Sequence, residues 1–288
     1  MIQALSGQLL LGLINGSFYA LLSLGLAIIF GLLNVVNFTH GALYMMGAFA
    51  AWFLMSALGI GYWWALLLAP LAVGLLGAGI ERLLLRRIRG LDHLYGLLLT
   101  FGLTLIAEGL FHQAYGNSGQ GYPVPEALRG GVRLGFMYLP IYRAWVVLVS
   151  AVVCAASWFV IEKTKLGAYL RAGTENPRLL QAFGVNVPLM FTVTYGFGVG
   201  LAAFAGVMAA PIYQVQPLMG SSLVIVVFAV VVIGGMGSIA GSIVTGLGIG
   251  LVEGFTKFLY PEASAVIVFV VMAVVLLVRP AGLFGRER

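Results

Sequence analysis

Long apolar segments alternate with short polar connections along almost the whole chain. A helix that crosses a bilayer needs about 20 mostly apolar residues, and nine segments approach this length. They lie at roughly residues 7–33, 41–58, 62–84, 93–113, 142–161, 189–210, 221–236, 242–260 and 263–279. The pattern predicts an all-α fold, a polytopic transmembrane helix bundle of about nine helices, within a range of roughly eight to ten.

Two of the nine segments depart from the ordinary length of a crossing. The segment 7–33 is too long for one straight crossing, so we expect it to tilt or break between Gly31 and Asn37. The segment 221–236 is short enough to be a half-helix. We therefore expect broken or re-entrant segments within the bundle.

The composition makes lipid the solvent of this chain. It is 61% hydrophobic and 8% charged, whereas a soluble domain carries about 25% charged residues. A soluble fold must present a polar outside, which so few charges cannot cover. The 40 glycines are about twice the usual share, and small residues let membrane helices approach closely. We expect a single transmembrane domain over residues 1–288.

Lys and Arg residues gather on one face of the predicted bundle. An excess of Lys and Arg marks the cytoplasmic side. We therefore place the C-terminus and the loop 162–188 in the cytoplasm, and the polar, Gly- and Pro-rich loop 114–141 on the opposite side. Because the basic residues lie in clusters between apolar runs, the net charge of +6 reflects topology, and we expect no nucleic acid as a partner. The clusters are Arg82, Arg86, Arg87 and Arg89; Lys163, Lys165, Arg171 and Arg178; and Arg279, Arg286 and Arg288.

Two polar or Gly-rich stretches interrupt the apolar pattern, one in each half of the chain. Each follows a long apolar run and precedes a Gly-rich one, which is typical of an internal repeat with a substrate path at the breaks. Broken helices expose backbone groups that membrane depth tolerates only against protein or a water-filled cavity. The alternative is that both stretches are ordinary tight turns at the cytoplasmic surface. The candidate pathway residues are Asn34, Asn37, His40 and Gly41 in the first stretch, and Gly235, Gly237, Ser238 and Gly241 in the second.

The chain lacks the motifs of an energy-converting or catalytic protein. No GxxxxGK[ST] phosphate loop and no HExxH, CxxC or GxSxG motif occurs. The three histidines have no ligand-like spacing, and Cys154 is the single cysteine. We therefore predict no catalytic residue, no metal site and no cofactor on this chain.

Ionisable residues within the apolar segments would mark an ion-coupled transporter. Glu108 has His112 one turn later, and Glu253 has Lys257 at the favourable i,i+4 spacing. Each is either a locally neutralised pair near the interface or part of the substrate path. No central chain of Asp, Glu or Arg indicates proton or sodium coupling.

The loop 162–188 is the longest hydrophilic stretch and contains the signals of a short helix. Asn176 can cap it, Pro177 can occupy its first position, and Gly184 can end it. Leu179, Leu180 and Phe183 fall near one face, so the helix either lies at the lipid interface or docks into a partner's groove.

Short motifs are spread along nearly the whole chain. They lie at Gly12–Leu21, Leu24–Leu26, Ile29–Gly31, Asn37–Gly41, Thr164–Gly167, Arg171–Ala172, Ala182–Asn186, Gly234–Gly241 and Arg279–Gly285. Together they resemble the permease subunits of bacterial ABC importers for branched-chain amino acids, with Thr39 where the family usually has Ala. Each piece is weak alone, but together they occur in order and at family-like spacing.

This resemblance implies an assembly in a bacterial inner membrane. The chain would pair with an identical or related permease subunit, and a periplasmic substrate-binding protein would deliver the solute. ATP would bind to two separate cytoplasmic ATPase subunits, which agrees with the missing phosphate loop. The resemblance also implies a coupling site for those subunits at Arg171, Thr174, Glu175, Asn176, Ala182 and Gly184.

The substrate implied by the resemblance is leucine, isoleucine or valine, with urea or a short amide as the alternative for the same type of permease. A stand-alone secondary transporter or channel would need central ionisable residues or a filter-like repeat. A membrane-embedded enzyme would need clustered catalytic groups. The sequence contains neither pattern.

Overall fold

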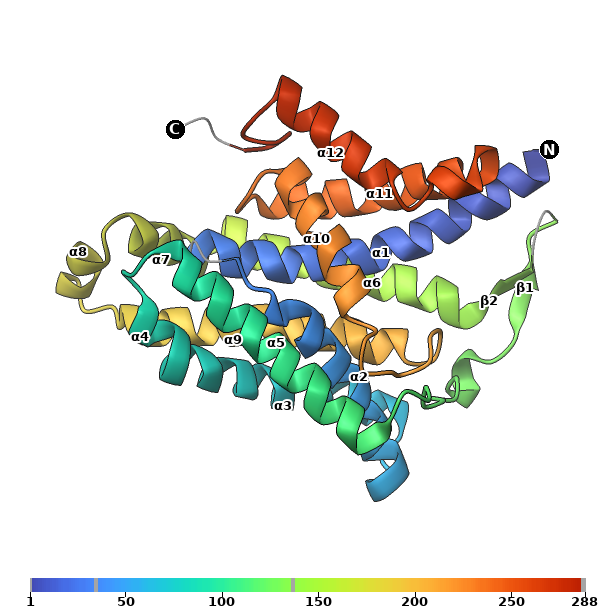
Figure 1. Ribbon diagram of the computed structural model, residues 1–288, viewed down its shortest axis with the longest axis horizontal. Coiled ribbons are helices and arrows are strands. Elements are labelled where there is room, and N and C mark those ends of the chain that lie inside the picture. The colour runs from blue at the N-terminus through green and yellow to red at the C-terminus, as the bar shows by residue number, and fades with distance from the viewer. Residues whose placement is uncertain (1, 34–35, 136–137, 286–288) are drawn as a thin grey trace. The chain divides into compact units, whose positions relative to one another are not determined.

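The computed structural model describes the chain except residues 1, 34–35, 136–137 and 286–288. Within this described part, seven helices are long and apolar enough to cross a membrane, and two shorter apolar helices accompany them. The prediction of an all-α polytopic bundle is confirmed (Figure 1). The long helices are α1 (Ile2–Leu33), α2 (Thr39–Leu58), α3 (Tyr62–Ile80, continued by a π-helical turn Glu81–Leu85 and α4, Arg86–Ile88), α5 (His93–Tyr115), α6 (Ile141–Lys163), α9 (Val187–Ala209) and α11 (Ile239–Leu259); the short ones are α10 (Ser221–Gly234) and α12 (Ile267–Val278).

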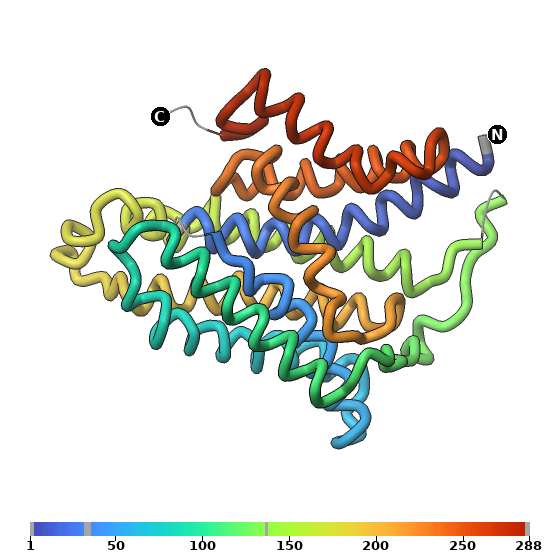
Figure 2. The backbone as a smooth tube through the Cα atoms, in the orientation of Figure 1, coloured from blue at the N-terminus to red at the C-terminus, as the bar shows by residue number. Residues whose placement is uncertain are grey.

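Three helices differ in length from an ordinary crossing. Helix α1 has 32 residues and is about 48 Å long, which exceeds the roughly 30 Å of the hydrocarbon core. It ends at Leu33 and α2 begins at Thr39, as the predicted break requires (Figure 2). Helix α10 has 14 residues and is short, as expected. Helix α12 has only 12, because a 3₁₀ turn (Pro261–Ala263) and further turn residues replace the start of the predicted segment 263–279.

The helices form two compact units. The first unit comprises Met1–Leu24, Pro123–Cys154 and Ile225–Arg288, and the second comprises Gly25–Tyr122 and Ala155–Val224. Helices α1, α6 and α10 each contribute residues to both units. The assignment of residues 1–288 to a single permease domain, and the internal repeat, remain predictions.

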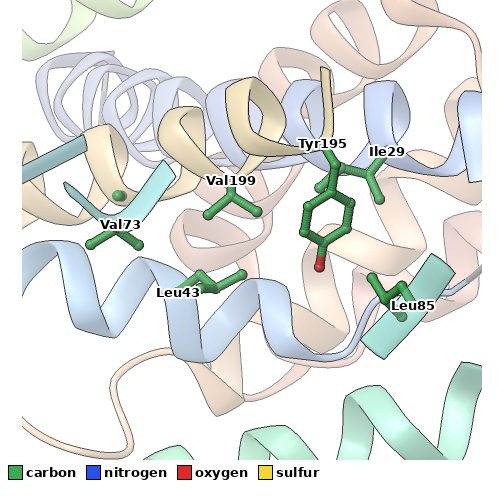
Figure 3. Packing of buried hydrophobic residues seen from close by; sticks show 7 residues of the cluster. Ile29, Leu43, Val73, Leu85, Tyr195 and Val199 are labelled. Carbon is green, nitrogen blue, oxygen red and sulfur yellow. The ribbon is translucent and has the colours of Figure 1, made fainter. Parts of the chain in front are cut away.

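The core of the second unit lies where α9 packs against α2 and α3. Figure 3 shows Tyr195 and Val199 of α9 among Leu43 of α2 and their buried neighbours. Helices α9 and α2 approach closely because a glycine lies at their contact. A Cβ atom added to Gly206 of α9 would lie 2.0 Å from the carbonyl oxygen of Tyr44 in α2. Such small-residue contacts are the ordinary means of packing helices in lipid.

The first unit is built on the contact between α1 and α11. A Cβ atom added to Gly250 would lie 2.4 Å from the Gly12 carbonyl oxygen, so the two backbones nearly touch. Two hydrogen bonds accompany this contact. The Tyr19 hydroxyl donates to Glu253 Oε2 (2.7 Å), and the Ser23 hydroxyl donates to the carbonyl oxygen of Ser242 (3.1 Å).

The two long connections are more structured than a loop. The connection predicted as the periplasmic loop 114–141 contains a 3₁₀ turn (Glu126–Leu128) and an antiparallel pair, β1 (Gly131–Arg133) with β2 (Tyr138–Pro140), neither of which we predicted. The loop 162–188 folds into α7 (Lys165–Glu175) and α8 (Pro177–Ala182). Local backbone pairing, rather than an apolar pattern, creates the small hairpin, so hydrophobicity did not reveal it.

The contact between α1 and α11 can be tested with two leucine substitutions in one helix. Gly250→Leu should lower the melting temperature of the purified protein, because overpacking a tight contact costs about 1–3 kcal/mol. Gly248 has open space around an added Cβ atom, so Gly248→Leu is the matched control and should melt like the wild type. Equal melting temperatures for the two variants would contradict the observed packing.

Candidate functional site

The first break, between α1 and α2, is a buried polar junction within the second unit. The backbone N–H of Phe38 donates to the Thr100 hydroxyl oxygen of α5 (3.3 Å), and the same hydroxyl lies 3.2 Å from the Val36 carbonyl oxygen. One buried side chain thus satisfies backbone groups that neither helix can pair. This is how interrupted helices persist at membrane depth.

The side chains of the first break are also buried and paired. Asn37 is 1% exposed; its Nδ2 donates to the Tyr195 hydroxyl oxygen (3.1 Å), and its Oδ1 accepts from the Thr39 hydroxyl (2.7 Å). The His40 ring is equally buried and lies against Gly25 of α1. These burials show that the first break is not a solvent-exposed surface turn.

Gly41 brings the first break into backbone contact with the segment before α10. A Cβ atom added to Gly41 would lie 2.7 Å from the Gly220 carbonyl oxygen. The structure therefore gathers Asn37, His40 and Gly41 at one junction. Asn34 lies outside the described residues.

The second break, between α10 and α11, lies in the first unit and is a tight Gly-rich turn. Gly235 (φ +98°) and Gly237 (φ +85°) adopt left-handed conformations that favour glycine. The Ser238 hydroxyl oxygen accepts from the Gly241 N–H (3.1 Å) and caps α11. A Cβ atom at Gly241 would lie 2.2 Å from the Gly234 carbonyl oxygen, so this glycine is needed for close approach of the two helices.

The C-terminal segment closes the second break. The N–H groups of Leu283 and Phe284 donate to the carbonyl oxygens of Ile233 and Gly234 (2.8 and 3.1 Å). These are carbonyls at the end of α10 that have no partner within the helix. The C-terminal piece Arg279–Gly285 therefore pairs the end of α10, a role that the sequence analysis did not predict.

The predicted coupling residues lie on α7, α8 and their flanks. Asn176 caps α8 through its side chain (3.0 Å to the Leu179 nitrogen), and Gly184 with φ +83° ends the helix region, as predicted. Arg171 donates to the Ile161 carbonyl oxygen (3.3 Å) and pairs with Glu162 (3.4 Å). The residues Arg171, Thr174, Glu175, Asn176, Ala182 and Gly184 are all exposed.

The apolar residues of α8 do not share one face, which corrects our expectation. Leu180 is buried against Val187 and Phe191, whereas Leu179 is 56% and Phe183 77% exposed. Leu179 and Phe183 are four positions apart and share the exposed side, whereas Leu180 directly follows Leu179 and is turned about 100° away from it around the helix axis. Leu180 anchors the helix, and Leu179 and Phe183 remain available on its outside.

Glu81 is a buried carboxylate that the sequence analysis missed. It is 0% exposed, pairs with Arg89 (2.5 Å) and accepts a hydrogen bond from the Thr192 hydroxyl of α9. The Arg89 guanidinium also lies 4.8 Å from the centre of the Phe191 ring, and Phe191 packs on Leu180 of α8. The pair thus connects the end of α3, the start of α9 and α8. A π-helical turn at Glu81 is consistent with a functional position.

Positive charge is in excess around this pair. A cavity of about 250 Å³ lies beside it and is lined partly by Arg82, Arg86 and Thr192. The pKa of Arg89 is lowered, chiefly because its guanidinium is partly buried. The adjacent Glu81 opposes this shift, and the like charge of Arg86 adds to it. From the sequence we interpreted these arginines only as a sign of topology. Glu81, the one acid beside them, stands between an apolar run and the basic cluster, and nothing in that position shows that it is buried.

The two expected carboxylate pairs have different outcomes. Glu253 pairs with Lys257, as predicted, and also accepts from Tyr19. Glu108 does not pair with His112; its carboxylate accepts from the hydroxyl of Ser221 at the start of α10. Among the described residues, no three His, Cys, Asp or Glu side chains are grouped so that they could hold a metal ion.

Comparison with known proteins shows the family to which the chain belongs. Residues 8–276 match the family described as "Branched-chain amino acid transport system / permease component". The chain belongs to this family. The match covers both breaks and the α7–α8 loop, so it includes every site described above except the C-terminal segment.

Curated relatives agree over nearly the full length of this permease. The protein LivH of Escherichia coli, named a high-affinity branched-chain amino acid transport system permease protein, is 28% identical over 294 residues, covering 97% of this chain and 95% of LivH. BraD of Pseudomonas aeruginosa, with the same descriptive name, is 29% identical over 297 residues at the same coverage. A probable branched-chain amino acid transport permease protein of Methanocaldococcus jannaschii is 26% identical over 293 residues, covering 96% of this chain and 91% of that protein. No solved structure matches the chain.

The pairing of Glu81 with Arg89 predicts a large loss of stability when the cation alone is removed. Arg89→Ala leaves a buried carboxylate uncompensated, which costs about 3–5 kcal/mol, and should markedly lower the melting temperature. Arg87→Ala, which removes an exposed neighbouring arginine, is the control. The double variant Arg89→Ala with Glu81→Gln should recover most of the loss. A single Arg89→Ala variant that melts like the control would show that the pair is not a stabilising contact.

Proposed function

We propose that this permease is the transmembrane subunit of an ABC importer that takes up branched-chain amino acids. It would form half of the translocation pathway and depend on separate ATPase subunits for energy. The names of the relatives support the substrate, and the missing phosphate loop supports the division of labour. The observation that carries the coupling part is the construction of α8, with Leu180 anchored inside and Phe183 exposed.

The α7–α8 loop is the proposed docking surface for two cytoplasmic ATPase subunits. A surface that transmits force needs one side held rigidly to the membrane helices and one side free to bind. Leu180 meets Phe191 of α9, and Phe191 meets Arg89, which is fixed by buried Glu81. Movement of α8 would therefore act on α9, the helix whose Tyr195 holds Asn37 of the first break.

The two breaks are the proposed pathway elements, at Asn37, His40 and Gly41 in the second unit and at Gly235, Gly237, Ser238 and Gly241 in the first. The remaining partners are a second permease subunit and a periplasmic substrate-binding protein. The protein would reside in the bacterial inner membrane with its C-terminus in the cytoplasm, on the side given by the basic clusters.

The docking proposal predicts opposite behaviour for two neighbouring substitutions. Phe183→Ser should weaken binding of the ATPase subunit to the solubilised permease while leaving its melting temperature unchanged, because the ring is exposed. Leu180→Ala should lower the melting temperature, since truncating a buried Leu costs about 2–5 kcal/mol. Affinity can be measured by pull-down at graded ATPase concentrations. Wild-type ATPase affinity in Phe183→Ser would contradict the docking surface.

The substrate proposal predicts the pattern of competition for uptake. Proteoliposomes holding the complete importer should accumulate labelled leucine, and excess isoleucine or valine should suppress this uptake. Urea and acetamide should leave it unchanged. Suppression by urea or acetamide, without suppression by isoleucine or valine, would assign the permease to the alternative substrate class.

A further inference from the structure

Four carboxylates of the described chain lie within or at the end of membrane-spanning segments, and they are not equivalent. Glu81 has Arg89 as its cation, and Glu253 has Lys257. Glu162, at the end of α6, pairs with Arg171. For Glu108 the described residues provide the hydroxyl of Ser221 but no ion pair with Lys, Arg or His. A carboxylate without a cation at membrane depth is costly, and such residues are typical of substrate or ion pathways.

Glu108 lies about two helical turns inside α5, one of the helices long and apolar enough to cross a membrane. At about 1.5 Å per residue, its Cα atom is roughly 10 Å from the end of the helix at Tyr115. Its side chain is half-buried among the described residues. An ionised group in this position requires a positive partner that the described chain does not contain.

The position of Ser221 connects Glu108 with the first break. Ser221 follows Gly220 directly, and Gly220 is in backbone contact with Gly41. The carboxylate is therefore adjacent to the junction that holds Asn37, His40 and Gly41, all within the second unit.

Aromatic rings lie one and two turns further along the same helix face. Phe111 and Tyr115 follow Glu108 at three and seven positions, the spacing that repeats one face of a helix. Their rings are 5.9 Å apart, and both pack on Phe49 of α2 (4.8 Å from each). A negative group next to an apolar, half-buried wall suits a molecule with a cationic end and an aliphatic end.

We propose that Glu108, supported by the Ser221 hydroxyl, binds the α-ammonium group of a zwitterionic amino acid during translocation. The ammonium group supplies the missing cation, and Phe111 and Tyr115 face the aliphatic side chain. Urea and short amides carry no cation and would leave the carboxylate uncompensated. This inference rests on the proposed function and gives the acid at this position a role in transport.

The test uses the complete importer in proteoliposomes with Glu108→Gln, Glu108→Asp and Ser221→Ala variants. Glu108→Gln should lower leucine uptake about tenfold or more, because a site built for a polar group loses its partner, while ATPase association is retained. Glu108→Asp should keep part of the uptake, and Ser221→Ala should have a smaller effect than Glu108→Gln. Glu126→Gln, in an exposed turn outside the spans, is the matched control and should transport like the wild type.

A second readout separates substrate binding from a structural role. The leucine analogue 4-methylpentanoate lacks only the ammonium group. It should compete poorly with leucine in the wild type. In Glu108→Gln, the preference for leucine over 4-methylpentanoate should be smaller than in the wild type. An unchanged preference, or wild-type leucine uptake in Glu108→Gln, would overturn the assignment of Glu108. Dissociation of the permease pair in Glu108→Gln, seen by gel filtration, would overturn the assignment as well. It would show that the carboxylate binds a cation of the partner subunit.

Failure of the proposed function gives a different result from failure of this inference. If the wild-type importer carries urea or acetamide and not leucine, the substrate proposal itself is wrong. If the wild-type importer and the Glu108→Gln variant carry leucine equally well, only the assignment of the ammonium site is wrong.

Discussion

The structure depends on one constraint, that lipid offers no hydrogen bonds to a polar group. Every interruption of a helix must therefore find partners within the protein. The two breaks meet this constraint in different ways. At the first, the Thr100 hydroxyl serves the backbone and Tyr195 serves Asn37. At the second, the C-terminal segment donates its N–H groups to the end of α10. Each break is thereby fixed in place, and a rigid break can serve as part of a path for a polar solute.

The same constraint governs the few charges. Glu81 and Glu253 are each neutralised by a neighbouring cation, and each also accepts a hydrogen bond from a hydroxyl. The ion pairs are local, but these hydroxyl contacts connect different helices: Thr192 of α9 binds Glu81, and Tyr19 of α1 binds Glu253 of α11. Glu108 is the exception, and the exception lies beside the first break. Among the described residues, the acids of the spans thus divide into those paired with a cation and Glu108, which has a hydroxyl partner in Ser221.

Much of this architecture could be predicted from the sequence because lipid enforces a simple pattern. The nine apolar helices, the end of α1 at Leu33, the cap at Asn176 and the pair of Glu253 with Lys257 all follow from local spacing. What could not be predicted requires knowledge of which helices meet. The partner of Glu108 is 113 residues away in Ser221, and that of Asn37 is 158 residues away in Tyr195. Glu81 was overlooked because a single acid beside four arginines gives no sign that it is buried. The small hairpin at Gly131–Arg133 arises from backbone pairing, which hydrophobicity does not record.

We propose above that this permease transports its solute and that separate ATPase subunits supply the energy. The most direct measurement compares driving forces in proteoliposomes. Leucine accumulation should require the ATPase subunits and ATP, and an imposed proton or sodium gradient should produce none when ATP is withheld. Gradient-driven accumulation by the permease without ATPase subunits would contradict the account.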